Sequence, residues 1–328
     1  MSLLDYDFMQ RALIAAVLTG LAAPAIGTYL VQRRLALMGD GIGHVALTGV
    51  AAGILTGFAP VWTAALVAIA GAVTIELVRA RGKASADVAL AILFYGGIAG
   101  GVLLIGLADS TPADLHAYLF GSILTVAPSD VWTIAVLGAI VIVLCVGLRP
   151  QLFAVCQDEE FARVAGLPVK LYSVLIAVMA AVTVTVSMRT VGLLLVSALM
   201  VVPVATSQQL TRGFKATFTL ALVLGVAASV SGLVFAYHVD VAPGASIVVI
   251  ALAGFALAWP VGTALRRVRA ARINGEDPRL GEAHVAAESH PHRHSEQCGH
   301  PAVEHEDHTD YLHDGHLHAQ HGAHYDEH

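Results

Sequence analysis

Long apolar runs recur along most of the chain, and they restrict its fold more than any other feature. A helix needs about twenty such residues to cross the hydrocarbon core of a bilayer. Hydrophobic residues make up 57% of the 328 residues and charged residues only 13%. We predict an all-α, polytopic transmembrane helical bundle of eight or nine spans, at residues 9–31, 35–57, 60–79, 87–107, 130–148, 170–188, 190–211, 215–237 and 244–265.

The chain changes character near residue 273, where the apolar runs stop and acids and histidines dominate. We divide it into a transmembrane domain, 1–272, and a tail, 273–328, that we predict to be disordered. Imidazole is a good ligand for zinc, copper and nickel, so the tail is expected to bind metal weakly. The candidate ligands are His290, His292, His294, His313, His316, His318, His321 and His324. The alternative is a solvated, low-complexity tail that binds metal only in vitro.

The lysines and arginines predict the orientation of the chain, because short cytoplasmic loops are enriched in them. With the N-terminus outside, the outer segments hold only Arg11 and Arg189. The inner segments then hold Arg33, Arg34, Arg79, Arg81, Lys83, Arg149, Arg163, Lys170, Arg212, Lys215, Arg266, Arg267, Arg269 and Arg272. This asymmetry places the tail in the cytoplasm and favours an odd number of spans.

Asp40 and His44 are the polar residues that most strongly indicate a function. They are four residues apart in an apolar run, so they share one face of the expected helix. Counted from Arg34, Asp40 lies roughly 9 Å and His44 roughly 15 Å along a helix that crosses a core about 30 Å thick. A carboxylate at such depth is typical of an ion path, and with imidazole it suits a divalent transition metal. The alternative is a structural pair that fixes helix packing.

The loop that follows the fifth expected span predicts a short helix. Asp158 is a good N-cap, with Glu159 and Glu160 favoured in the first turn. Gly166 then ends the helix, and Pro168 prevents its continuation. Such a helix either docks into the groove of a partner or lies as a solvated helix at the membrane interface.

These two segments together resemble the permease subunit of the metal-importing ABC transporters, which take up zinc, manganese or iron. Residues 37–47, with Asp40 and His44, are similar to the signature of the family's second helix. Asp158, Glu160, Ala162 and Gly166 match its coupling segment, Asp-x-Glu-x-Ala-x-x-x-Gly. The segments 119–121 and 191–199 are also similar to family segments, and the resemblance covers about residues 9–265.

The resemblance implies a bacterial inner-membrane permease that works as a homodimer, with a separate ABC ATPase and an extracytoplasmic metal-binding protein. It also implies that Asp40 and His44 contact the ion, and that the segment of Asp158, Glu160, Ala162 and Gly166 couples to the ATPase. Many relatives end soon after the last helix, so the resemblance assigns no role to the tail. The histidines favour zinc as the transported ion, with manganese and iron as alternatives.

Other functional classes are expected to show different sequence motifs. The chain contains no GxxxxGK[ST] motif, so ATP hydrolysis requires another protein, and we expect no enzymatic activity, tightly bound cofactor or nucleic-acid partner. The main alternative is a proton-coupled secondary metal carrier with a His-rich cytoplasmic segment. A membrane-anchored metal sensor is a third alternative, which the position of Asp40 and the coupling-type loop disfavour.

Overall fold

The computed structural model describes residues 6–81, 86–107, 118–122, 126–188, 190–276, 285–286, 299–305, 308–313, 316–321 and 324–327. The chain forms two compact units, Met1–Thr263 and Ala264–His328. The predicted domain boundary at residue 272 falls inside the last helix, which runs on to Glu276.

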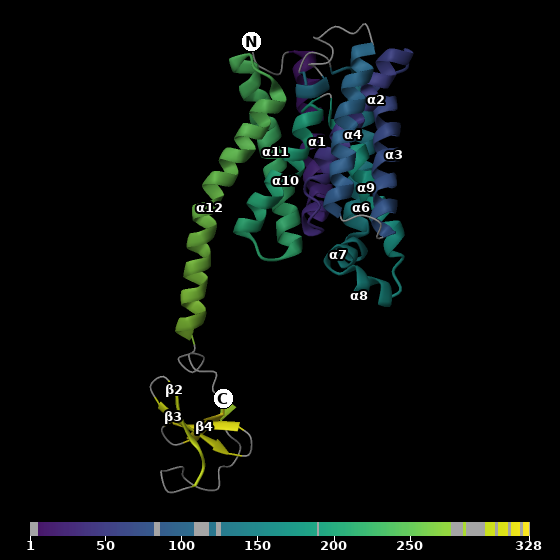
Figure 1. Cartoon of the computed structure of the whole chain (residues 1–328). Helices are drawn as coiled ribbons and strands as arrows, with labels where there is room; N and C mark the ends of the chain where they lie inside the picture. Colours follow the sequence, from purple (N-terminus) through teal and green to yellow (C-terminus); the bar gives the residue numbers. More distant parts are fainter. Residues whose placement is uncertain are drawn as a thin grey trace. The chain divides into compact units, whose positions relative to one another are not determined.

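The first unit is a helical bundle, as the apolar runs predict (Figure 1). Its helices, together with the last one, are α1 (Asp7–Gln32), α2 (Met38–Thr56), α3 (Pro60–Ala80), α4 (Ala86–Leu107), α6 (Pro128–Gly147), α7 (Arg149–Gln157), α8 (Glu159–Val164), α9 (Val169–Ser187), α10 (Leu193–Leu210), α11 (Phe214–Val239) and α12 (Pro243–Glu276). Within the described residues, 8 helices are long and apolar enough to cross a membrane: α1, α2, α3, α4, α6, α9, α11 and α12. The all-α polytopic fold is therefore confirmed.

The remaining expected span, 190–211, corresponds to α10, whose apolar part covers only Leu195–Leu210. Pro203 lies inside α10, which continues through it as one helix. The helix is shortened at its start, where Gly192 has a left-handed φ of 90°. A Cβ on Gly192 would lie 2.3 Å from the carbonyl oxygen of Leu119, so this turn packs directly on another backbone segment.

The helices differ in how much of each is buried, and this difference distinguishes the inner helices of the bundle from the outer ones. Most of α1, α2 and α9 is buried within the protein, whereas only 22% of the apolar windows of α4, α6 and α12 is buried. The exposed side chains are large and apolar, such as Ile92, Trp132 and Leu257. A soluble protein would bury such surface, so the outer helices present it to lipid.

Small residues allow α2 and α4 to approach closely. A Cβ on Gly97 of α4 would lie 2.6 Å from the backbone nitrogen of Val45 and 2.7 Å from the carbonyl carbon of His44. Thr48 donates a hydrogen bond of 2.8 Å to the carbonyl oxygen of Gly97. This contact fixes α4 against the part of α2 that carries His44.

The second unit contains an antiparallel sheet with the strand order β1-β5-β4-β3-β2. Its strands are β1 (Val285–Ala286), β2 (Ala302–His305), β3 (His308–His313), β4 (His316–His321) and β5 (His324–Glu327). For these segments the structure differs from the predicted disordered tail. A sequence basis exists in the two-residue connections, among them Asp314-Gly315, a dipeptide that favours tight hairpins. The register pairs His305 with His308, His313 with His316 and His321 with His324.

Candidate ion path and coupling helix

The start of α2 changes the predicted depth of the Asp40–His44 pair. The helix begins at Met38 and not near residue 35, because residues 33–37 form a turn. Measured from Met38, Asp40 lies only roughly 3 Å and His44 roughly 9 Å along the helix axis. Asp40 is thus a first-turn residue, where the positive end of the helix dipole favours a carboxylate. The helix therefore starts later than predicted, and the depth of His44 in the membrane stays a prediction.

Asp40 contacts a helix that is far away in the sequence. Ser197 of α10 donates a hydrogen bond of 3.3 Å to Oδ1 of Asp40. The two residues are 157 positions apart, so the motif around Asp40 did not reveal this partner. The hydroxyl is a weak neutral donor, and it leaves most of the hydrogen-bonding capacity of a carboxylate unused.

His44 lies one turn further along α2, against an aromatic ring of α4. The centroids of the His44 and Phe94 rings are 4.4 Å apart, with the rings inclined at 75°. The Nδ1 atom of His44 is buried and has no hydrogen-bond partner among the described residues. Buried polar atoms are normally paired, so an unpaired imidazole nitrogen indicates a ligand position.

A cavity with a volume of about 400 Å³ adjoins Asp40. It is lined by Leu37 and Asp40 from the start of α2 and by Leu90, Ala91, Phe94 and Tyr95 from α4. Within the described part of the chain, no three His, Cys, Asp or Glu side chains gather into a metal-binding group. The pair therefore offers fewer ligands than a structural zinc site, which usually has four.

The predicted short helix is confirmed as α8, which follows α7 at one end of the bundle (Figure 1). Oδ1 of Asp158 accepts hydrogen bonds of 2.9 Å from the backbone nitrogens of Glu160 and Phe161. Gly166 has a φ of 82° and donates to the carbonyl oxygen of Arg163 at 3.1 Å. Leu167 donates to that of Ala162 at 3.0 Å, which completes a Schellman motif. Both ends of α8 are thus fixed as the sequence predicts.

The two faces of α8 have different roles. Ala162 is fully buried and packs with Val155 and Val169, so it holds the helix on the bundle. Phe161 and Val164 lie on the outer face, where they are 68% and 88% exposed. The coupling motif predicted from the sequence does not include these two apolar residues, although their spacing of three places them on one helix face. Together they offer an apolar contact surface to a partner.

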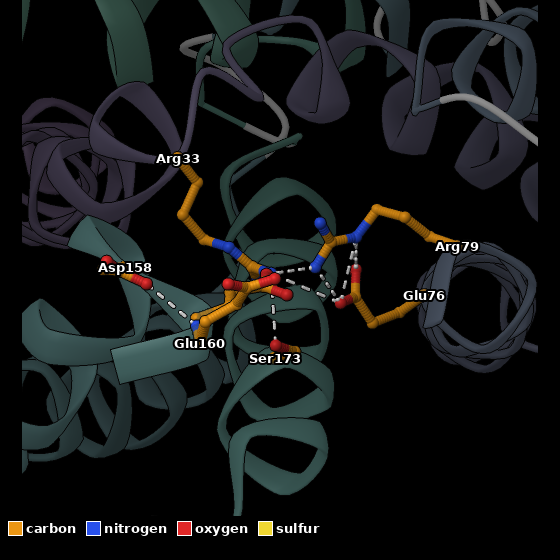
Figure 2. A network of polar contacts seen from close by, with 7 residues as sticks. Arg33, Glu76, Arg79, Asp158, Glu160 and Ser173 are labelled. Carbon is orange, nitrogen blue, oxygen red and sulfur yellow. Dashed lines mark hydrogen bonds and ion pairs between the residues drawn. The ribbon is translucent and has the colours of Figure 1, made fainter. Parts of the chain in front are cut away.

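Glu159, which was not assigned a specific role either, joins α8 to a network of polar contacts that includes Arg33, Glu76, Arg79 and Ser173 (Figure 2). Its Oε1 accepts a hydrogen bond of 2.7 Å from Nη2 of Arg79 and another from Nη2 of Arg33. Arg79 also binds Glu76, three residues earlier in α3, with an Nη2–Oε1 distance of 2.7 Å. Arg33 donates to Ser173 at 3.1 Å, so the network joins α8 to α3, α9 and the residue that follows α1.

Two opposing effects act on the pKa of Glu159. Partial burial raises the pKa of this carboxyl, but the hydrogen bonds and positive charges of Arg79 and Arg33 lower it by more. The pKa of Glu159 therefore lies below its ordinary value, and the side chain is a carboxylate at neutral pH. The ion pairs with both arginines are thus present under physiological conditions.

Comparison with known proteins identifies the class of molecule. A model described as the ABC 3 transport family matches residues 5–261. The chain belongs to this family. It is 34% identical over 257 residues to the manganese transport system membrane protein MntC of Halalkalibacterium halodurans, a match that covers 78% of this chain and 88% of that protein. It is 32% identical over 264 residues to the manganese import system permease protein ScaB of Streptococcus parasanguinis, which covers 80% and 94%.

A solved structure supports the same assignment to the ABC 3 family. The structure described as PsaBC from Streptococcus pneumoniae in complex with Fab matches with a TM-score of 0.71 and 33% identity, over 78% of this chain and 92% of that chain. The protein is therefore a multi-pass membrane permease of a bacterial ABC metal importer, and it is not itself catalytic. Family membership sets aside the secondary carrier and the sensor.

The tail of this ABC 3 permease lies beyond the residues that the family model matches. His290, His292 and His294 fall outside the described residues. His313, His316, His321 and His324 are described only as backbone positions of β3, β4 and β5. His318 is 5% exposed, in register with Tyr311 and Glu327 of the neighbouring strands. Metal binding by the tail remains a prediction.

Proposed function

We propose that this permease imports manganese(II) and that Asp40 and His44 contact the ion on its path. The observation that carries the proposal is the buried, unpaired Nδ1 of His44, one helical turn from a carboxylate with a single weak donor among the described residues. An aspartate oxygen and an imidazole nitrogen on one helix face form a partial ligand set for a divalent ion. The cavity beside Asp40 gives an ion access to it.

The choice of manganese rests on the names of the relatives and on the position of the histidines. The relatives that support it, MntC and ScaB, are named as manganese transporters. The preference for zinc came from the histidines of the tail, which lie outside the matched residues 5–261. Within the matched part, the carboxylate of Asp40 is a ligand that manganese accepts readily.

The proposal includes the partners and the orientation that the resemblance implies. A homodimer of this chain works with an ABC ATPase and receives the ion from an extracytoplasmic metal-binding protein. The outer face of α8, with Phe161 and Val164 exposed, supports docking of the ATPase at that end of the bundle. The basic residues of the short loops place this end in the cytoplasm and the N-terminus outside. No tightly bound cofactor is required.

Uptake of radioactive ⁵⁴Mn by vesicles that contain the whole transporter tests the proposal. Asp40→Asn keeps the size of the side chain and removes its charge, and His44→Ala removes the unpaired nitrogen. Each is expected to reduce uptake more than tenfold while the complex still assembles, since one lost ligand costs at least about 1.4 kcal/mol. Unlabelled manganese is expected to compete better than zinc or iron.

The exposed residues His238 and Asp240 provide matched controls. His238→Ala and Asp240→Asn make the same chemical changes at the end of α11, and uptake is expected to remain near that of the wild type. Near-normal uptake in Asp40→Asn and His44→Ala would show that the pair only fixes helix packing. Stronger competition by zinc would refute the choice of manganese and leave the ion path intact.

A further inference from the structure

We propose that Glu159 is a positioning residue through which displacement of α8 reaches the turn between α1 and α2, and hence the Asp40–His44 segment. The proposal rests on the proposed function, in which the ATPase docks on α8. It assigns to Glu159 a role that differs from that of the exposed outer face. Glu159 does not touch the ion but acts on it through Arg33.

The first step is the connection between α8 and the end of α1. Arg33 directly follows α1, and its side chain is 3% exposed. It pairs with Glu159, which is 126 positions away in the sequence and belongs to the first turn of α8. Because breaking a buried ion pair is costly, Arg33 tends to follow Glu159 when α8 moves.

The second step is the short turn from Arg33 to α2. Arg34 adopts a left-handed φ of 59°, which is unusual for a residue with a side chain. Arg34 donates to the carbonyl oxygen of Val31 at 3.0 Å and Leu35 to that of Leu30 at 2.8 Å, so a Schellman motif closes α1. Met38 then donates to Leu35 at 2.9 Å as α2 begins. A hydrogen-bonded turn of this length transmits movement of Arg33 to the helix that carries Asp40.

The third step is an alternative partner that allows Arg33 to change its position. Nη2 of Arg33 lies 3.5 Å from Oε1 of Glu76, which is longer than its contact with Glu159. Glu76 is 2% exposed and is also bound by Arg79. As Arg33 follows Glu159, its longer contact with Glu76 can change while Glu159 remains its partner, so no buried charge is left without a partner. This second carboxylate lets Arg33 change its position at low cost, as a switching element requires.

The surroundings of the cluster leave room for this change. A cavity of about 210 Å³ lies beside it, lined by residues of α3, α8 and α9 that include Glu76, Arg79, Glu159, Lys170 and Ser173. Glu159 keeps 36% of its side chain exposed, whereas Glu76 and Arg33 are buried. Glu159 is thus the most accessible of these three side chains, and displacement of α8 acts on it first.

The experiment measures the number of ATP molecules hydrolysed per manganese ion imported by the complete transporter in vesicles. Glu159→Gln keeps the shape of the side chain and removes the charge that holds Arg33 and Arg79. The ratio is expected to rise about fivefold or more, the size of a typical coupling between two sites. A residue with a purely structural role would lower the amount of folded complex and leave this ratio unchanged. Lys170→Gln is the control, since Lys170 lines the same cavity and forms no ion pair with the described residues.

Two results would overturn the proposal, and a third would refute the proposed function on which it rests. An unchanged ratio in Glu159→Gln, with normal uptake by the wild type, overturns it. If Glu159→Gln does not assemble, the shorter carboxylate of Glu159→Asp decides, and a wild-type ratio in that variant overturns it as well. If the wild-type complex shows no ATP-dependent uptake, the proposed function itself fails, and that failure is recognised before any variant is compared.

Discussion

The cluster of ion pairs beside α8 and the Asp40–His44 pair of α2 differ in how many partners their polar atoms have. Around Glu76, Arg79, Arg33 and Glu159, each charge has at least two partners among the described residues, and four salt bridges are formed. Asp40 receives one hydrogen bond of 3.3 Å from Ser197, and the buried Nδ1 of His44 has no partner in the described part of the chain. Structural networks are normally complete, whereas a site for a transient ion keeps ligand positions free.

This difference predicts that substitutions in the ion-pair cluster mainly lower stability, whereas substitutions of the Asp40–His44 pair mainly lower transport. Removing a charge from the complete network leaves its buried partners with one opposite charge fewer. Replacing Asp40 removes a proposed ligand but breaks only one weak hydrogen bond. The effects below are arranged from the largest to the smallest.

Glu76→Gln is expected to have the largest effect on stability. It leaves Arg33 and Arg79 with Glu159 as their remaining carboxylate in the network, which costs up to about 3–5 kcal/mol. Thermal unfolding of the detergent-solubilised protein measures the loss. Asp40→Asn is expected to unfold within roughly 1 kcal/mol of the wild type, because a weak neutral hydrogen bond contributes no more. Equal destabilisation by the two variants would refute the distinction between the regions.

Gly97→Ala tests whether close packing positions the incomplete site. The added Cβ would lie 2.6 Å from the backbone of Val45, so α4 must shift away from α2, at a cost of about 1–3 kcal/mol. Gly96 is the matched control, because a Cβ there meets no atom of the described residues within 4 Å. Gly96→Ala is expected to preserve or raise the unfolding temperature, whereas Gly97→Ala lowers it and reduces manganese uptake. The same result for both glycines would mean that this contact is unimportant.

The smallest effect is the response of the network to acid. The pKa of Glu159 is lower in the folded protein than in the unfolded chain, so its ion pairs stabilise the fold above the ordinary carboxyl pKa of about 4.3. This contribution is lost as the pH falls through the lowered pKa of the folded state. The difference in unfolding temperature between the wild type and Glu159→Gln should therefore shrink below about pH 4.3. A difference that stays constant down to pH 3 would show that the carboxylate does not stabilise the fold.

Local patterns in the sequence predicted those parts of the protein that depend on neighbouring residues. Apolar runs located the spans, and the capping residues Asp158 and Gly166 fixed both ends of α8. The same approach placed the start of α2 three residues too early, because the apolar character of Leu35 and Leu37 does not distinguish a helix from the turn that the structure shows.

The sequence by itself determined that this chain is a helical membrane permease with an aspartate and a histidine on one face of its second helix. Only the tertiary structure decided which partners these residues have. Ser197 reaches Asp40 across 157 positions, and Glu159 reaches Arg79 and Arg33 across 80 and 126. Helix periodicity and capping act within a few residues, whereas these contacts depend on how distant helices pack, which no single segment encodes.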